Sequence, residues 1–229
     1  KHISGKSPYR SPTDMGVNMA GYCIVDDDAC RAASCAEIIR RYYTAMVDCR
    51  KGRAAEDAVQ KIKSIMNQMD LSPEDRAVAV AAEKRSSETG EQPAAAIELP
   101  DGRIVTGKTS DLLGASAAAL LNAVKALAGM EKSLHLLHPS VIGPIQQLKT
   151  GPLGNRNPRL HSDEVLVALA VSAASSALAA EAMAQLPRLR GCEAHSSVIL
   201  GQVDEDVYRR LGFNLTCTPR YESRKLYHK

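Results

Sequence analysis

The chain has 229 residues, which is enough for one large domain or two small ones. Its 45% hydrophobic and 24% charged residues are typical of a soluble globular protein. A net charge of +3, dispersed along the chain, is too small to indicate a nucleic-acid partner. Aromatic residues make up only 3%, which excludes base-stacking platforms and aromatic cages. The 33 alanines instead predict a core in which backbones approach each other closely.

The first part of the chain predicts a helical unit. Residues 1–25 are punctuated by glycine and proline, so we expect an irregular lead-in segment. Apolar residues at helical spacing then indicate two helices, and Ser72 followed by Pro73 is typical of the start of a third. The sequence SSETGEQP at 86–93 has the composition of a linker. We therefore expect a helical subdomain over 26–90.

The rest of the chain, 91–229, predicts a layered α/β domain around a mixed sheet. It begins with a hairpin of strands at 94–99 and 103–106 around Pro100-Asp101-Gly102. We then expect a helix at 112–129, a strand at 134–137, a helix at 141–149 and a long helix capped by Ser162. The last three elements are a strand from about 194 to 200, a helix capped by Asp204 and closed by Gly212, and a strand at 213–218. The predicted order is ββαβααβαβ.

Cysteine usage and hydropathy indicate a cytoplasmic protein with no membrane partner. None of the six cysteines forms a CxxC pair, so the signature of a structural zinc site is missing. The longest uncharged run, 165–180, is shorter than the roughly 20 apolar residues of a membrane span. No signal peptide opens the chain, and because it begins with Lys1 rather than Met, we expect further residues upstream.

Two glycine-lysine segments are candidate anion sites. Lys108, Thr109 and Ser110 lie between a predicted strand and a helix, where backbone amides, a lysine and hydroxyls attract phosphate. The alternative is a tight turn with hydroxyl caps. Lys6, in Gly5-Lys6-Ser7, is a similar fragment and a further candidate ligand.

The loop at 154–164 gathers several polar groups at the start of a helix. Asn157 and Arg159 are candidate ligands for an anionic oxygen, and His161 with Glu164 is a candidate pair for proton transfer. The alternative is that the acids complement the helix dipole and that asparagine and proline build the turn. The phosphate-site hypothesis requires Arg159 to lie near Lys108.

A third polar group precedes a predicted core strand. Alternation places Glu193 and His195 on one face, where they could share a site with the 157–164 loop, and Cys192 with His195 is a candidate nucleophile pair. Zinc on Cys192, His195 and His161 would make a metal hydrolase, although no ligand spacing supports it, and we assign no metal site. The alternative is a hydrogen-bonded structural histidine.

Five segments together resemble a bacterial family, domain-of-unknown-function family 1846, also called uncharacterised protein family 0371. They are GKSPYRSPTDMGVNMAGYCI (5–24), EIIRRYY (37–43), VTGKTSDLLGASAAALLNAVK (105–125), NPRLHSDEVLVALAVSA (157–173) and GCEAHSSVIL (191–200). The resemblance implies that this chain is the C-terminal half of a protein about twice as long, with the missing N-terminal half as a partner.

The resemblance also implies a cytidine-deaminase-like topology, but no activity, cofactor or catalytic residue. The zinc signature of the deaminases is a His or Cys before Ala-Glu, followed later by Pro-Cys-x-x-Cys. The equivalent helix start here, Leu113-Gly114-Ala115-Ser116, has no such ligand, and no cysteine pair follows. Zinc-dependent deamination is therefore not expected.

Two hypotheses of different class follow. In the first, the chain is part of a cytosolic bacterial enzyme that binds a phosphate-bearing small molecule or nucleotide at strand-to-helix loops. In the second, it is a non-catalytic assembly module whose alanine-rich helices pack against the missing half or a second copy in a homo-oligomer.

Overall fold

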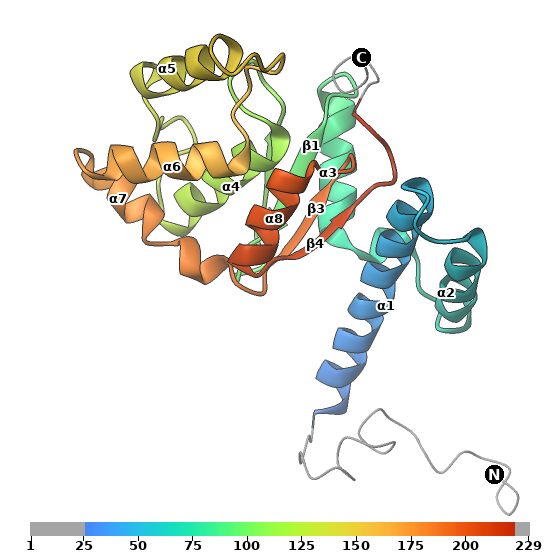
Figure 1. The fold of residues 1–229 in the computed structure, drawn as a ribbon. Helices are drawn as coiled ribbons and strands as arrows, with labels where there is room; N and C mark the ends of the chain where they lie inside the picture. The colour runs from blue at the N-terminus through green and yellow to red at the C-terminus, as the bar shows by residue number, and fades with distance from the viewer. Residues whose placement is uncertain (1–25, 223–229) are drawn as a thin grey trace, which may run out of the picture.

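The computed structural model describes residues 26–222, in which a helical N-terminal region leads into a mixed four-stranded sheet covered by helices (Figure 1). The α/β-type class expected from the sequence is confirmed. In chain order the elements are α1 (Asp27–Arg50), α2 (Glu56–Gln68), the 3-10 turn η2 (Pro73–Asp75), α3 (Ala77–Glu88), β1 (Ala94–Glu98), β2 (Ile104–Lys108), α4 (Ala115–Leu127), α5 (Pro139–Thr150), α6 (Ser162–Ala173), α7 (Ala177–Met183), the 3-10 turn η3 (Leu186–Leu189), β3 (Glu193–Ser196), α8 (Gln202–Leu211) and β4 (Asn214–Cys217).

The sheet has the strand order β2-β1-β3-β4. β1 is antiparallel to both of its neighbours, and β3 and β4 are parallel. In this register Ala96 of β1 lies opposite Thr106 on one side and His195 on the other. Residues of β1 alternate between two faces, and because helices cover both, four of its five residues are buried.

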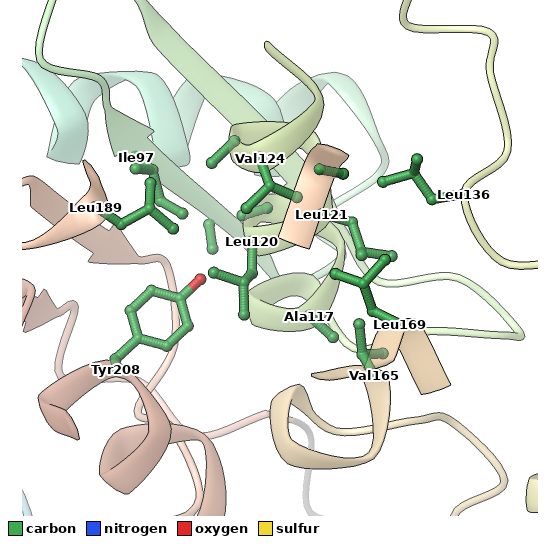
Figure 2. Packing of buried hydrophobic residues seen from close by; sticks show 14 of the residues in the cluster. Ile97, Ala117, Leu120, Leu121, Val124, Leu136, Val165, Leu169, Leu189 and Tyr208 are labelled. Atoms are coloured by element: carbon green, nitrogen blue, oxygen red, sulfur yellow. The ribbon is translucent and has the colours of Figure 1, made fainter. Parts of the chain in front are cut away.

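One face of the sheet packs against α4 and carries the largest core cluster (Figure 2). Ile97 of β1 meets Leu120 and Val124 of α4, and Tyr208 of α8 closes the cluster, its hydroxyl donating to the Ser116 carbonyl oxygen at 2.8 Å. Alanines fill the remaining positions, as the composition predicts. Small side chains let α4 and the sheet come together with few large groups between them.

The opposite face packs against α3 and α1. Ala96 lies in a small cluster with Val78 and Ala82 of α3. The ring of Tyr43, from α1, meets the His195 ring edge-on with centroids 4.8 Å apart. The helical region therefore forms one layer of the α/β fold. The proposed boundary at residue 90 stays a prediction, and the lead-in 1–25 lies outside the described residues.

Two elements that the sequence predicts on the α4 side of the sheet differ in the structure. Residues 134–137 form no strand: they belong to a turn-rich segment in which Leu136 and Leu137 are buried in the core. The long helix predicted from Ser162 breaks after Ala173. The Ser176 side chain accepts from the Ala179 amide and so caps α7 as a separate helix, which is the local competition that serine offers to a continuing helix.

Two predicted helix caps are also wrong. α8 begins at Gln202 with Gly201 as its N-cap, not at Asp204. α6 has His161 rather than Ser162 as its N-cap. The reason is that Ser162 and Asp204 bond to each other: the Ser162 amide and hydroxyl both donate to Asp204 Oδ1, at 2.8 and 2.6 Å. In the described part of the chain no helix has both the length and the apolar character needed to cross a membrane.

Candidate functional site

A cavity of about 890 Å³ opens where the helical region meets the α/β layers. Its walls are the end of α1 with the turn that follows, the starts of α4, α6 and α8, the loop before α6, and the residues after β3 and β4. Its lining residues are Arg50, Lys51, Arg53, Pro93, Thr109, Gly114, Ala115, Ser116, Asn157, Arg159, Leu160, His161, Val198, Ile199, Leu200, Gly201, Gln202, Asp204, Glu205, Pro219, Arg220, Tyr221 and Glu222.

The lining is positive. It contains five lysines and arginines against three carboxylates, which leaves a net charge of +2 before His161 is counted. Three of these cations come from the end of α1 and the turn after it: Arg50, Lys51 and Arg53. Lys51 pairs with Glu205 at 3.6 Å, whereas Arg53 is exposed and has no ion-pair partner among residues 26–222. Clefts lined by one sign of charge concentrate ligands of the opposite sign.

Two helices begin at this cavity without a side-chain cap. The N-caps of α4 and α8 are Gly114 and Gly201, and neither helix start receives a side-chain hydrogen bond. Their first-turn amides carry the positive end of the helix dipole. Together with the cations, these amides can hold an anionic oxygen at the cavity wall.

His161 and Asp204 meet beside these helix starts. His161 Nδ1 lies 3.0 Å from Asp204 Oδ2, and the Asp204 side chain is only 9% exposed. The hydrogen bond to Asp204 raises the pKa of His161, against the opposing effect of burial. Burial raises the pKa of Asp204, but the hydrogen bonds from His161 and Ser162 outweigh it, so that pKa lies below its ordinary value. The pair can hold a proton at the cavity.

The Glu164 side chain makes hydrogen bonds within the protein and does not line the cavity. One of its oxygens accepts from the His161 amide at 2.8 Å, which ties the N-cap residue to the first turn of α6. The same oxygen accepts from Lys149 Nζ at 2.6 Å, and Lys149 also donates to the Arg159 carbonyl oxygen at 2.6 Å. This buried lysine therefore fixes the loop that carries Arg159 and His161 to the cavity.

Cys192, Glu193 and His195 do not line the cavity. Glu193 accepts from Arg40 and Arg76, and His195 bonds Thr216 through Nδ1 at 2.7 Å and Thr218 through Nε2 at 3.0 Å. Both side chains belong to the face covered by α1 and α3.

Cys192 lies in the core cluster on the opposite face, with the pKa of its thiol raised by burial. The structure therefore does not bring the three residues together with the 157–164 loop, because successive residues of β3 face opposite layers. A nucleophile pair of Cys192 and His195 has no geometric support.

Of the predicted ligands, Thr109, Asn157 and Arg159 line the cavity, and Lys108 and Ser110 do not. Lys108 therefore does not share this site with Arg159, as the hypothesis drawn from the sequence required, and the cavity has other cations in its place. The Ser110 hydroxyl instead accepts from the Leu113 amide at 3.1 Å in a tight turn. Arg159 pairs with Glu222 at 3.2 Å. Lys6 lies outside the described residues.

The sequence analysis missed seven charged residues of this cavity. They are Arg50, Lys51, Arg53, Asp204, Glu205, Arg220 and Glu222. The first three form a short basic run in the sequence at the end of the first helix, which is a signal, but nothing local connects that run with a loop more than a hundred residues later. Within the described ranges no group of three or more His, Cys, Asp or Glu could hold a metal ion.

The fold and the cavity define an α/β-type protein with a cationic pocket between its helical region and its mixed sheet. The chain belongs to the DUF1846 family: the description "Domain of unknown function DUF1846, C-terminal" matches residues 74–227, and "Domain of unknown function DUF1846, N-terminal" matches residues 1–70. The resemblance drawn from the sequence is confirmed.

Curated relatives agree with this membership. The chain is 54% identical over all 229 residues to the UPF0371 protein stu1377 of Streptococcus thermophilus and 52% identical to the UPF0371 protein SpyM50764 of Streptococcus pyogenes serotype M5. Each of the two alignments covers 100% of this chain and 46% of the relative. The chain thus spans about half the length of these relatives.

Proposed function

We propose that this chain is part of a bacterial enzyme whose cavity binds a phosphate-bearing small molecule, such as a nucleotide. The observation that carries the proposal is the excess of basic over acidic residues in the lining, five against three, around two helix starts that have glycine N-caps. A phosphate group offers several acceptor oxygens and up to two negative charges, which such donors and dipoles satisfy together.

The size and the remaining lining of the cavity support a ligand larger than a free ion. A volume of about 890 Å³ is in the range of sites for organic ligands. Apolar residues after β3, Val198 and Ile199, form another part of the lining. We expect the phosphate at the cationic wall and the organic part of the ligand against this apolar wall.

Isothermal titration of the full-length protein with inorganic phosphate and adenosine monophosphate tests the proposal. Arg53→Gln removes a cation that has no ion-pair partner among residues 26–222, so we expect an affinity loss of about tenfold or more, as for a charge-assisted hydrogen bond. Lys63→Gln is the control, because Lys63 is exposed on α2 and does not line the cavity. Equal losses in both variants, or no binding by the unmodified protein, would contradict the proposal.

We also propose that the sheet has the cytidine-deaminase-like topology. The position of β1, antiparallel to both neighbours, and the helix that follows the hairpin support it. In zinc deaminases the metal ligands stand at helix starts. The start of α4, at Gly114 and Ala115, offers backbone amides instead of a His or Cys ligand. The proposed site would therefore use anion binding where the deaminases use a metal.

The second candidate function is assembly through the outer surface of α6 and α7. Val167 and Val171 lie one helical turn apart on α6 and are 63% and 62% exposed, and Leu178 of α7 is 45% exposed. Exposed apolar residues that cluster on neighbouring helices are typical of an interface.

Light scattering after size-exclusion chromatography of the full-length protein tests the assembly function. Val167→Lys combined with Val171→Lys should reduce the mass of any oligomer. Val80→Lys is the matched control, since Val80 is a similarly exposed valine on α3. A monomer at every concentration, or an oligomer indifferent to the α6 changes, argues against this function.

A further inference from the structure

Asp204 occupies an unusual place for a carboxylate in the first turn of a helix. Such residues commonly lie in solvent and complement the dipole of their own helix. Asp204 instead is 6% exposed and turns toward the start of α6. There it accepts three hydrogen bonds: two from Ser162, and one from the His161 ring. These bonds hold the carboxylate in one position.

The position of Asp204 fixes the chemistry of His161. Because Nδ1 bonds the carboxylate, Nδ1 carries the proton and Nε2 is the nitrogen left for a ligand. Nε2 has no protein partner among residues 26–222, and the ring is 26% exposed and lines the cavity. A neutral ring offers a lone pair at Nε2, and a protonated ring offers an N–H donor and a positive charge.

The other described histidines with hydrogen bonds differ from His161. Both ring nitrogens of His195 are engaged by threonine hydroxyls, and burial lowers its pKa to about 3. His138 is also an N-cap residue, but its Nδ1 bonds Ser140, two residues later, and it does not line the cavity. Only His161 of these three combines a free nitrogen, an anchoring carboxylate and the cavity.

The charges around His161 determine when its ring is protonated. Asp204 of α8 and Glu164 of α6 favour the imidazolium, and Lys149 of α5 opposes it. Glu164 and Lys149 are paired with each other, so their effects on the ring partly cancel. Arg159 and the other cavity cations face the same space and also oppose protonation, until an anion binds among them.

We propose that His161, positioned by Asp204, contacts the phosphate of the bound ligand through Nε2 as an imidazolium, so that ligand binding takes up a proton. The inference rests on the proposed phosphate-binding function of the cavity. It assigns to one residue the exchange of a proton with the ligand. The inference also predicts that the site binds the fully ionised anion, paired with the protonated ring, in preference to the protonated anion.

Calorimetric titration of the full-length protein in buffers of different ionisation enthalpy measures this proton uptake. The probes are inorganic phosphate and sulfate at pH 7.5. Sulfate keeps the same charge across this pH range, so any proton taken up when it binds must bind to the protein. We expect uptake of up to one proton with either probe, and an affinity that falls by up to tenfold for each pH unit above the pKa of His161.

His161→Asn is the decisive variant. Asparagine places an amide where Nδ1 lies and is a favoured N-cap residue, so folding should be retained and can be checked by the melting temperature. We expect weaker binding without proton uptake. Asp204→Asn removes the carboxylate that favours the imidazolium, so we expect this variant to bind the anion with less proton uptake at the same pH. His138→Asn, which changes the other N-cap histidine, should behave like the unmodified protein.

The outcomes separate this inference from the function on which it rests. Binding by the unmodified protein without proton uptake, or with uptake that His161→Asn leaves unchanged, overturns the role of His161 while the phosphate site stands. Absence of any binding by phosphate, sulfate and adenosine monophosphate overturns both.

Discussion

Arg76 and Glu193 form a largely buried ion pair that joins the residue before α3 to the first residue of β3. The Arg76 side chain is 5% exposed, and its guanidinium also donates to the carbonyl oxygens of Ala194 and Asn214, at 3.0 and 2.8 Å. One side chain therefore binds two parallel strands and the helical layer at once.

The first prediction concerns this pair. Arg76→Met should lower the free energy of unfolding by about 3 kcal/mol, because it removes the buried donor of two carbonyl oxygens and of Glu193 Oε2, while Arg40 still bonds Glu193 Oε1. Urea denaturation of the unmodified protein and the variant measures the difference. Arg103→Met, which breaks an exposed pair with Asp101, should leave the midpoint nearly unchanged. Similar losses of stability in both variants would show that the buried pair stabilises the protein no more than the exposed pair does.

The second prediction concerns pH. Burial, and then the charges of Arg76 and Arg220, lower the pKa of His195 to about 3, below the ordinary value of 6.5. The unfolded chain therefore binds a proton at His195 between pH 6.5 and 3, and the folded protein does not. The stability that this neutral histidine contributes is complete above pH 6.5 and falls by about 1.4 kcal/mol per pH unit below it.

Melting curves between pH 7 and 4.5 test this dependence. The difference in stability between the unmodified protein and His195→Gln should shrink as the pH falls, since the variant lacks the titrating ring. A His195 resonance that titrates near pH 6.5 in NMR spectra of the folded protein would contradict the assignment.

The third prediction concerns the close contact between β2 and α4. A Cβ added to Gly107 would collide with the backbone nitrogen of Ala119 and lie 2.7 Å from the Ala115 carbonyl oxygen. Because backbone atoms cannot move aside as side chains do, we expect Gly107→Ala to destabilise the protein by about 2 kcal/mol or more.

A second glycine supplies the matched control for this contact. Gly143 lies inside α5, and an added Cβ there meets no atom of another element within 4 Å. The gain in helix propensity is opposed by the ring of Pro144, which follows it, so Gly143→Ala should change stability by less than about 1 kcal/mol. Thermal unfolding compares both variants with the unmodified protein. If Gly107→Ala destabilises the protein no more than Gly143→Ala does, the close contact is not what determines the effect.

The fourth prediction concerns the cysteines. Burial raises the pKa of the Cys217 thiol to about 11 and also raises that of Cys192. Since the thiolate is the reactive form, iodoacetamide at pH 8 should modify the partly exposed Cys30, Cys35 and Cys49 first. Mass spectrometry of peptides after timed labelling measures the order. Early labelling of Cys192 would revive the hypothesis that it is a nucleophile.

Local patterns predicted the parts of the fold that depend on neighbouring residues. The hairpin forms around Pro100-Asp101-Gly102 as expected, because Gly102 takes the positive φ of 80° that the turn requires. Arg159 and His161 lie near a helix start at a cavity, as their position in the loop indicated. Each of these features is determined within a few residues of sequence.

The rest of the site depends on contacts that no local pattern contains. Asp204 was expected to cap its own helix, but its partner is His161, 43 residues earlier. Arg50 and Lys51 enter the cavity because α1 packs beside β4. The face of β3 on which His195 lies depends on the register with β1 and on which helices cover each side of the sheet. These relationships arise only when the layers pack.

The contact between α1 and β3 has a consequence for how the protein can be divided. The two family descriptions meet at residues 70–74, between α2 and α3. A fragment that begins at residue 74 would uncover the side of His195 on which Tyr43 lies, and would leave Glu193 without Arg40. It would also leave behind three of the five basic residues around the cavity. Expression of the C-terminal portion should therefore start ahead of α1, since the point where the two alignments join separates α1 from the β3 residues that it contacts.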